Sequence, residues 1–179
     1  MLFRSFLSLD LGKKWLVCYW PWEDSTDNKT LDDWKSMAEF LNTIGKKVRA
    51  TGMGFAYHNH DLEFRVTEGK IPYDVVLDNT DPSLVSMMID LYWIEKGGQK
   101  TIPYFEKYPG RFPLWHAKDM DATPERGFAC VGDGIIDFAS LFAKADLAGM
   151  QHVIVEHDMP ADGIECARTG FAALETLSH

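Results

Sequence analysis

The sequence predicts an α/β fold in which parallel strands alternate with helices. Short apolar runs rich in β-branched and aromatic residues alternate with amphipathic stretches of helical length. Most of these runs stay apolar up to a polar residue at their C-terminal end, as expected of strands covered on both faces. The 179 residues are 46% apolar and 25% charged, and no linker divides them. A single domain over residues 1–179 is therefore predicted.

Five strand–helix units are expected in order along the chain. The predicted strands are Trp15–Trp20, Gly54–Asn59, Val85–Leu91, Pro113–Lys118 and Val153–Glu156. The predicted helices run from Thr30 to about Gly52 and over Tyr73–Leu77, 99–108, Asp137–Ala148 and Gly163–Leu177. The first helix has acidic residues in its first turn and apolar residues at helical spacing, and Gly149 is expected to cap the fourth.

Charge and hydropathy exclude several classes of partner. The net charge of −9, from 27 acidic against 18 basic residues, argues against nucleic-acid binding. No apolar run approaches the ~20 residues of a membrane span, and the N-terminal stretch lacks a signal-peptide cleavage site. We therefore expect a cytoplasmic protein without membrane partners. Because Cys18, Cys130 and Cys166 are far apart and outside any CxxC spacing, we expect reduced, mostly buried thiols, without a disulfide framework or a thiolate zinc site.

Oxygen and imidazole groups lie where four of the predicted strands end. In parallel α/β folds, catalytic groups come from the C-terminal ends of the strands. Because side chains alternate along a strand, His60 faces the same side as His58. For the same reason Lys118 faces the same side as His116. Two carboxylates and two imidazoles suit a divalent ion such as Mn²⁺, Zn²⁺, Co²⁺ or Mg²⁺. The candidate metal ligands are His58, Asp90, His116 and Glu156.

Such an ion polarises a carbonyl and stabilises the enediolate formed when a neighbouring proton is removed, as in sugar isomerisation and epimerisation. The alternative for each residue alone is structural: a hydrogen-bonded histidine, a helix-capping aspartate, a solvated lysine. Trp20 and Trp93 could stack on a sugar, and Asn59 is a further candidate for substrate contact. The side chain of His157 is expected to face away from that of Glu156, so His157 is not among the candidate site residues.

Several segments resemble the sugar phosphate isomerase/epimerase family, also described as xylose isomerase-like TIM barrels. They are TLDDWKSMAEFLNTIGKKVRATGMGFAYHNHDLEF, MMIDLYWIEKGG, GRFPLWHAKDM, FACVGDGIIDF and VIVEHDMP, within residues 12–178. The resemblance implies a (β/α)₈ barrel with a divalent metal held at the last four strands. Asp90, His116 and Glu156 match three ligand positions, and His58 stands where the family's epimerases usually have Glu.

The resemblance implies a metal-dependent isomerase or epimerase acting on a ketose, sugar phosphate or keto-cyclitol. His58 leaves an inosose-dehydratase-like lyase as an alternative, with Glu156, His60 or Lys118 moving the protons. The match begins at the family's fourth strand, and residues 1–20 resemble the end of the family's third helix and the start of that strand. We therefore expect a partial barrel of about strands four to eight. Such a chain is expected to form a homodimer or to need a separate N-terminal fragment, and a non-catalytic metal-binding remnant or subunit is the remaining alternative.

Overall fold

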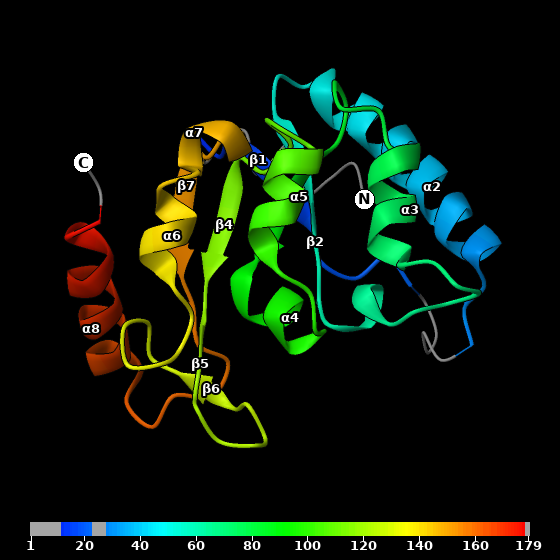
Figure 1. Cartoon of the computed structure of the whole chain (residues 1–179). Coiled ribbons are helices and arrows are strands. Elements are labelled where there is room, and N and C mark those ends of the chain that lie inside the picture. The colour runs from blue at the N-terminus through cyan, green and yellow to red at the C-terminus, as the bar shows by residue number, and fades with distance from the viewer. Residues whose placement is uncertain (1–11, 23–27, 178–179) are drawn as a thin grey trace. The chain divides into compact units, whose positions relative to one another are not determined.

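The computed structural model describes residues 12–22 and 28–177, so most of the N-terminal stretch compared above lies outside the described residues. The chain forms two compact units, Met1–Met88 and Ile89–His179 (Figure 1). The prediction of a single domain stays a prediction.

The described residues of the first unit form three parallel strands and two α-helices. Strand β1 (Trp15–Cys18) pairs with β2 (Gly54–His58), and β2 pairs with the start of β3 (Ser86–Asp90). Helix α2 (Leu31–Arg49) packs beside α3 (Pro72–Asn79), and the short 3₁₀ helix η1 (Leu62–Phe64) follows β2 (Figure 1). The alternation of parallel strands and helices predicted for this half is confirmed.

Helix α2 begins and packs as its sequence predicts. Thr30 and Asp33 form a reciprocal capping box, in which Asp33 N donates to the Thr30 hydroxyl and Thr30 N donates to the Asp33 carboxylate. Its apolar stripe, which includes Trp34, is buried. At Gly45 a Cβ atom would lie 2.6 Å from the carbonyl oxygen of Leu84, so only glycine allows this close approach.

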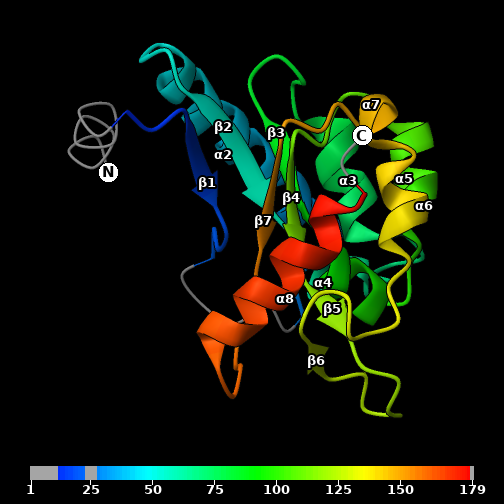
Figure 2. The ribbon, with the colours of Figure 1, turned by 90° about the vertical axis from the view of Figure 1, so that its left-hand side faces the viewer.

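The second unit contains the end of β3 and a parallel pair, β4 (Leu114–Ala117) and β7 (His152–Val155). Its helices are α4 (Leu91–Lys96), α5 (Thr101–Lys107), α6 (Phe138–Phe142), α7 (Ala145–Ala148) and α8 (Gly163–Glu175). An antiparallel pair, β5 (Asp119–Met120) and β6 (Phe128–Ala129), follows β4. Figure 2 shows α8 lying along β7.

Three local predictions for this half were wrong. The expected strand to Leu91 ends at Asp90, which caps α4, a helix that the continuous apolar run concealed. The expected helix from Asp137 to Ala148 is divided at Lys144, and no Gly or Pro marks the break. The residues after the fourth predicted strand, for which no further strand was predicted before Val153, form the β5–β6 hairpin. Among the described residues no helix is long and apolar enough to cross a membrane.

The prediction of reduced thiols was also wrong for two of the three cysteines. Cys130 and Cys166 form a disulfide across a sequence separation of 36 residues, joining the segment after β6 to α8. Cys18 is free and half-buried. The sequence could not show the pairing, because two cysteines at this separation match no motif and meet only when β6 and α8 pack together.

Candidate metal centre

Asp90 lies at the C-terminal end of β3 and is completely buried. Its Oδ1 atom accepts the main-chain NH groups of Tyr92 and Trp93, each at 3.0 Å, and so caps α4. This cap holds the carboxylate in one orientation, because a buried oxygen with two donors has little freedom to rotate. The second oxygen, Oδ2, is directed toward side chains from β4.

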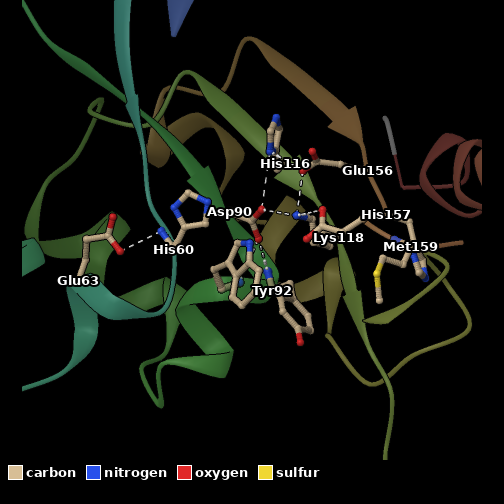
Figure 3. Close-up of polar contacts among 11 residues, drawn as sticks. His60, Glu63, Asp90, Tyr92, His116, Lys118, Glu156, His157 and Met159 are labelled. Atoms are coloured by element: carbon tan, nitrogen blue, oxygen red, sulfur yellow. Dashed lines mark hydrogen bonds and ion pairs between the residues drawn. The ribbon is translucent and has the colours of Figure 1, made fainter. Parts of the chain in front are cut away.

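His116 lies on β4 and meets two carboxylates. Its Nδ1 atom is 2.7 Å from Oε2 of Glu156 and 3.7 Å from Oδ2 of Asp90 (Figure 3). Glu156 follows β7 directly, and its main-chain NH donates to the carbonyl of Ala117 at 3.0 Å. The parallel pairing of β4 with β7 therefore brings these two side chains together, as the strand-end argument predicts.

Lys118 is buried among carboxylates, with 2% of its side chain exposed. Its Nζ atom lies 3.2 Å from Oδ2 of Asp90, 3.0 Å from Oε2 of Glu156 and 2.7 Å from Oδ1 of Asp158 (Figure 3). The rings of Trp93 and Phe128 lie 5.5 and 5.7 Å from the same atom, within range of a cation–π interaction. The ammonium group of Lys118 thus partly neutralises the charge of these three carboxylates.

The electrostatics of the centre follow from these contacts. Burial lowers the pKa of His116, but its hydrogen bonds to Asp90 and Glu156 outweigh burial and raise the pKa to about 9. The hydrogen bond to His116 lowers the pKa of Glu156 to about 2, against an opposing effect of burial. Burial lowers the pKa of Lys118, whereas the charge of Asp90 and bonds to Asp158 and Glu156 give a net rise. At neutral pH two cations therefore face three carboxylates.

The donor set fits a divalent metal ion. Asp90, His116 and Glu156 offer two carboxylate oxygens and an imidazole nitrogen, which suit hard or borderline ions. The same carboxylates already attract a buried ammonium group, so the centre favours positive charge. Because His116 must be neutral to bind a metal, ligation there would release a proton.

The first unit presents the other predicted site residues at the end of β2. His58 is buried, and its ring lies 4.8 Å from that of His60, which meets the edge of Trp20 at 5.7 Å. Trp20 is 42% exposed, whereas Asn59 is fully buried. The alternation that places the two histidines on one side of the strand end is therefore present in the structure.

A buried carboxylate holds this strand end in place. Glu63 accepts a hydrogen bond from the hydroxyl of Tyr57 at 2.5 Å and from the main-chain NH of His60 at 2.9 Å (Figure 3). Burial raises the pKa of Glu63 to about 7, although both hydrogen bonds lower it. Glu63 was not among the predicted site residues, since a glutamate three positions beyond a strand has no special pattern.

Two aspartates outside the predicted ligand set have defined partners near the centre. Asp158 was not singled out, yet it binds Lys118; its position two residues after Glu156 was the available signal. Asp119 instead accepts main-chain NH groups from Met120, Gly132, Gly134 and Ile136 at 2.8–3.1 Å. Asp119 therefore anchors the glycine-containing loop and is not a ligand of the centre.

The structure brings together Asp90, His116, Lys118 and Glu156 in the second unit, with Trp93 beside Lys118. His58, Asn59, His60 and Trp20 belong to the first unit. The metal-binding, catalytic and substrate-binding roles predicted for these residues stay predictions.

Comparison with known proteins places this geometry in a family. The sequence profile of the xylose isomerase-like TIM barrels matches residues 7–177. The chain is 28% identical over 148 residues to an inosose dehydratase of Bacillus cereus (strain AH820), covering 72% of this chain and 49% of the relative. An inosose dehydratase of Clostridium beijerinckii is 30% identical over 131 residues, covering 64% of this chain and 43% of that protein. The chain thus spans about half the length of these curated relatives.

Solved structures of similar fold support the same family. A sugar phosphate isomerase/epimerase from Parabacteroides distasonis superimposes with a TM-score of 0.81 at 27% identity, covering 96% of this chain and 60% of that one. The IOLI protein, solved with a zinc atom, has a TM-score of 0.73 at 16% identity, covering 97% of this chain and 66% of that one, and so shows the fold alone. With an α/β, TIM-barrel-like fold, this chain belongs to the xylose isomerase-like TIM barrel family.

Proposed function

We propose that the protein holds a divalent metal ion (Mn²⁺, Zn²⁺, Co²⁺ or Mg²⁺) through Asp90, His116 and Glu156, and transfers a proton beside the carbonyl of a polyhydroxylated ketone. The observation that carries this proposal is the meeting of two carboxylates and one imidazole at Nδ1 of His116, 2.7 and 3.7 Å from its partners. When bound, the ion would polarise the substrate carbonyl and stabilise negative charge on its oxygen.

His58 is proposed as the fourth ligand. In the first unit His58 pairs in parallel register with Met88, and Asp90 is two residues further along the same strand. Both residues close parallel strands, and functional groups in such folds come from the C-terminal ends of the strands. An imidazole ligand in place of a carboxylate leaves the bound ion with more positive charge, which favours stabilisation of an oxyanion.

Three residues are proposed to move protons or fix charge. His60 is the candidate base, because a half-buried imidazole can exchange a proton near neutral pH. Lys118 is a proton donor and a fixed positive charge, since its raised pKa keeps it protonated. Glu156 stays ionised and orients His116 and Lys118. Trp20 and Trp93 are proposed as flat surfaces for the substrate, with Asn59 as a polar contact.

Dehydration of a keto-cyclitol is the reaction we favour. His60 would take the proton from the carbon beside the carbonyl, the adjacent C–OH bond would break, and Lys118 would protonate the departing oxygen to give water and a C=C bond. A buried ammonium group among carboxylates supports this choice, as do the curated relatives named inosose dehydratase. The second candidate is isomerisation or epimerisation of a ketose or sugar phosphate, supported by the Parabacteroides distasonis structure.

Hydrogen exchange in D₂O, followed by NMR, tests the proposal for every candidate substrate. A keto-inositol, a ketohexose and a ketose phosphate are each incubated with the protein and Mn²⁺. We expect deuterium to enter beside the carbonyl, or water to be lost, at a rate at least about 100-fold lower in Glu156→Gln. Glu165→Gln, on the exposed face of α8, is the matched control and should leave the rate unchanged. Metal binding without exchange would contradict the proposal and support the non-catalytic remnant.

We also propose that the chain self-associates as a homodimer. Among the described residues, β1 pairs only with β2, and β7 pairs only with β4. Ile154 on β7 is 39% exposed and Phe171 on α8 is 65% exposed, and both are large apolar side chains. Unpaired strand edges beside apolar surface favour pairing with another chain. A cytoplasmic location and the absence of nucleic-acid partners stay predictions from composition.

A further inference from the structure

Three side chains outside the candidate metal centre converge in the second unit. Cys130 follows β6, His157 follows β7, and Cys166 lies in the first turns of α8. Each offers one ligand atom, and these atoms all lie within 4.8 Å of one another. Figure 3 shows that His157 points toward Met159 whereas Glu156 points toward His116. The cluster is therefore separate from the centre built on Asp90, His116 and Glu156.

The chemistry of this cluster is that of a soft metal site. Two thiolates and one imidazole form a donor set typical of Zn²⁺, which takes a water or substrate as a fourth ligand when the protein provides three. The Cα atoms of Cys130 and Cys166 are 5.2 Å apart, so their sulfur atoms can share one ion as well as one bond. Neither the sequence motifs nor the proposed function assigns any role to these three residues.

The surroundings hold the three side chains in place. Cys166 is 4% exposed and lies in the first turns of α8, whose N-terminus is fixed by Asp162 Oδ1, the acceptor of the main-chain NH groups of Ile164 and Glu165. The main-chain NH of Met159 donates to Nδ1 of His157 at 3.2 Å, and the ring of Phe128 packs against it with centroids 5.7 Å apart. These contacts hold the imidazole beside the two sulfur atoms. Ligation through Nε2 would move the ring proton to Nδ1 and release the bond from Met159.

We propose that Cys130, His157 and Cys166 form a second metal site, which binds Zn²⁺ in the reduced protein and closes as a disulfide when it is oxidised. The oxidant is a low-molecular-weight disulfide. The two thiolates lose two electrons and form the S–S bond, the oxidant's S–S bond breaks to give two thiols with two protons from water, and the metal ion is released. The structure then represents the oxidised form of this site.

Cobalt spectroscopy tests the proposal, because only a site with thiolate ligands gives a sulfur-to-cobalt charge-transfer band. The full-length protein is reduced, freed of metal and titrated with Co²⁺. We expect the band to saturate at one ion per chain and to vanish when oxidised glutathione is added. Cys18→Ser should keep the band, since Cys18 is free and lies in the first unit. His116→Asn should also keep it, which separates this site from the proposed catalytic centre.

Variants of the ligands complete the test. Cys130→Ser and Cys166→Ser should each lose about half of the charge-transfer band, and the double variant should lose it entirely, with folding checked by circular dichroism. His157→Gln should keep the sulfur band but bind Co²⁺ at least about tenfold more weakly, because it removes one of three ligands. Absence of the band in the reduced wild-type protein would overturn the proposal. So would a band that persists when Cys130 and Cys166 are both replaced, or one that oxidised glutathione does not remove.

Discussion

Nζ of Lys118 lies 3.0 Å from Oε2 of Glu156, although 2% of the lysine side chain and 36% of the glutamate side chain are exposed. The same ammonium group also meets the fully buried carboxylate of Asp90 at 3.2 Å. Lys118 therefore holds two of the candidate metal ligands in place when no metal ion is bound. A divalent ion and this ammonium group satisfy the same carboxylates, so either one can neutralise them.

Lys118→Met should destabilise the fold, and a divalent metal should restore part of the loss. Removing one partner of a buried ion pair leaves an uncompensated charge and costs about 3–5 kcal/mol, and partial exposure of Glu156 favours the lower end. Lys144→Met removes an exposed pair with Glu106 and should cost no more than about 1 kcal/mol. Chemical denaturation with and without Mn²⁺ measures both effects; equal losses in the two variants would contradict the argument.

Metal binding should release a proton from His116. Because its pKa is about 9 in the ion-free protein, the imidazole is charged at neutral pH and must be neutral to act as a ligand. The apparent affinity should therefore rise about tenfold per pH unit from pH 7 to about pH 9 and then level off. Calorimetric titrations in two buffers of different ionisation enthalpy count the protons. A value near zero would show that His116 is not a ligand.

Folding stability should decrease as the pH rises from about 4.5 to about 7 because of Glu63. Its folded pKa of about 7 lies above its ordinary value, so in this interval the native state binds more protons than the unfolded state. The loss amounts to roughly 3 kcal/mol by linkage. Glu63→Gln should flatten this part of the pH profile of unfolding free energy, whereas exposed Glu68→Gln should not. An unchanged slope in Glu63→Gln would refute the assignment.

Asp119→Ala should destabilise the second unit by about 2–4 kcal/mol. The substitution removes the acceptor of four main-chain NH groups, and unsatisfied buried donors are costly. Asp133→Ala, in the same loop but exposed, should have little effect. Thermal unfolding compares the two variants. A structural role also predicts that Asp119→Ala leaves the metal stoichiometry unchanged at temperatures where it is folded.

A homodimer should be the main species at micromolar concentration. Burial of apolar side chains such as Ile154 and Phe171 supplies roughly 25 cal/mol per Å², while the charge of −9 opposes association only through repulsion that salt screens. Sedimentation velocity at low and high salt measures the mass. A monomer that also fails to bind a hydrophobic dye would contradict the proposal.

Much of the fold could be predicted from local patterns. The capping box at Thr30 and the apolar stripe of α2 are local features, and the strand ends at His58, Asp90 and Glu156 follow from apolar runs closed by a polar residue. The register of β4 against β7 then brings His116 to Glu156 without further assumptions. The periodicity of apolar residues was sufficient to predict a helix or strand wherever residues close in sequence determine that element.

Features that depend on residues distant in sequence were missed. The partners of Asp119 lie 13 to 17 residues away in a loop, and the Cys130–Cys166 disulfide spans 36 residues. The rise in the pKa of Lys118 comes from three carboxylates on two segments distant in sequence, the end of β3 and the residues after β7, whereas burial alone would lower the pKa. Such effects arise from tertiary packing, so no spacing in one sequence reveals them.

Calorimetric titration of Mn²⁺ or Zn²⁺ into the metal-free protein decides whether Asp90, His116 and Glu156 hold a divalent ion. The protein is kept oxidised, so that the Cys130–Cys166 disulfide excludes thiolate binding. The account predicts one ion per chain in the wild type, loss of that binding in His116→Asn/Glu156→Gln, and its retention in the surface variant His152→Asn/Glu165→Gln. Wild-type protein that binds no ion, or saturation unchanged in His116→Asn/Glu156→Gln, would contradict it.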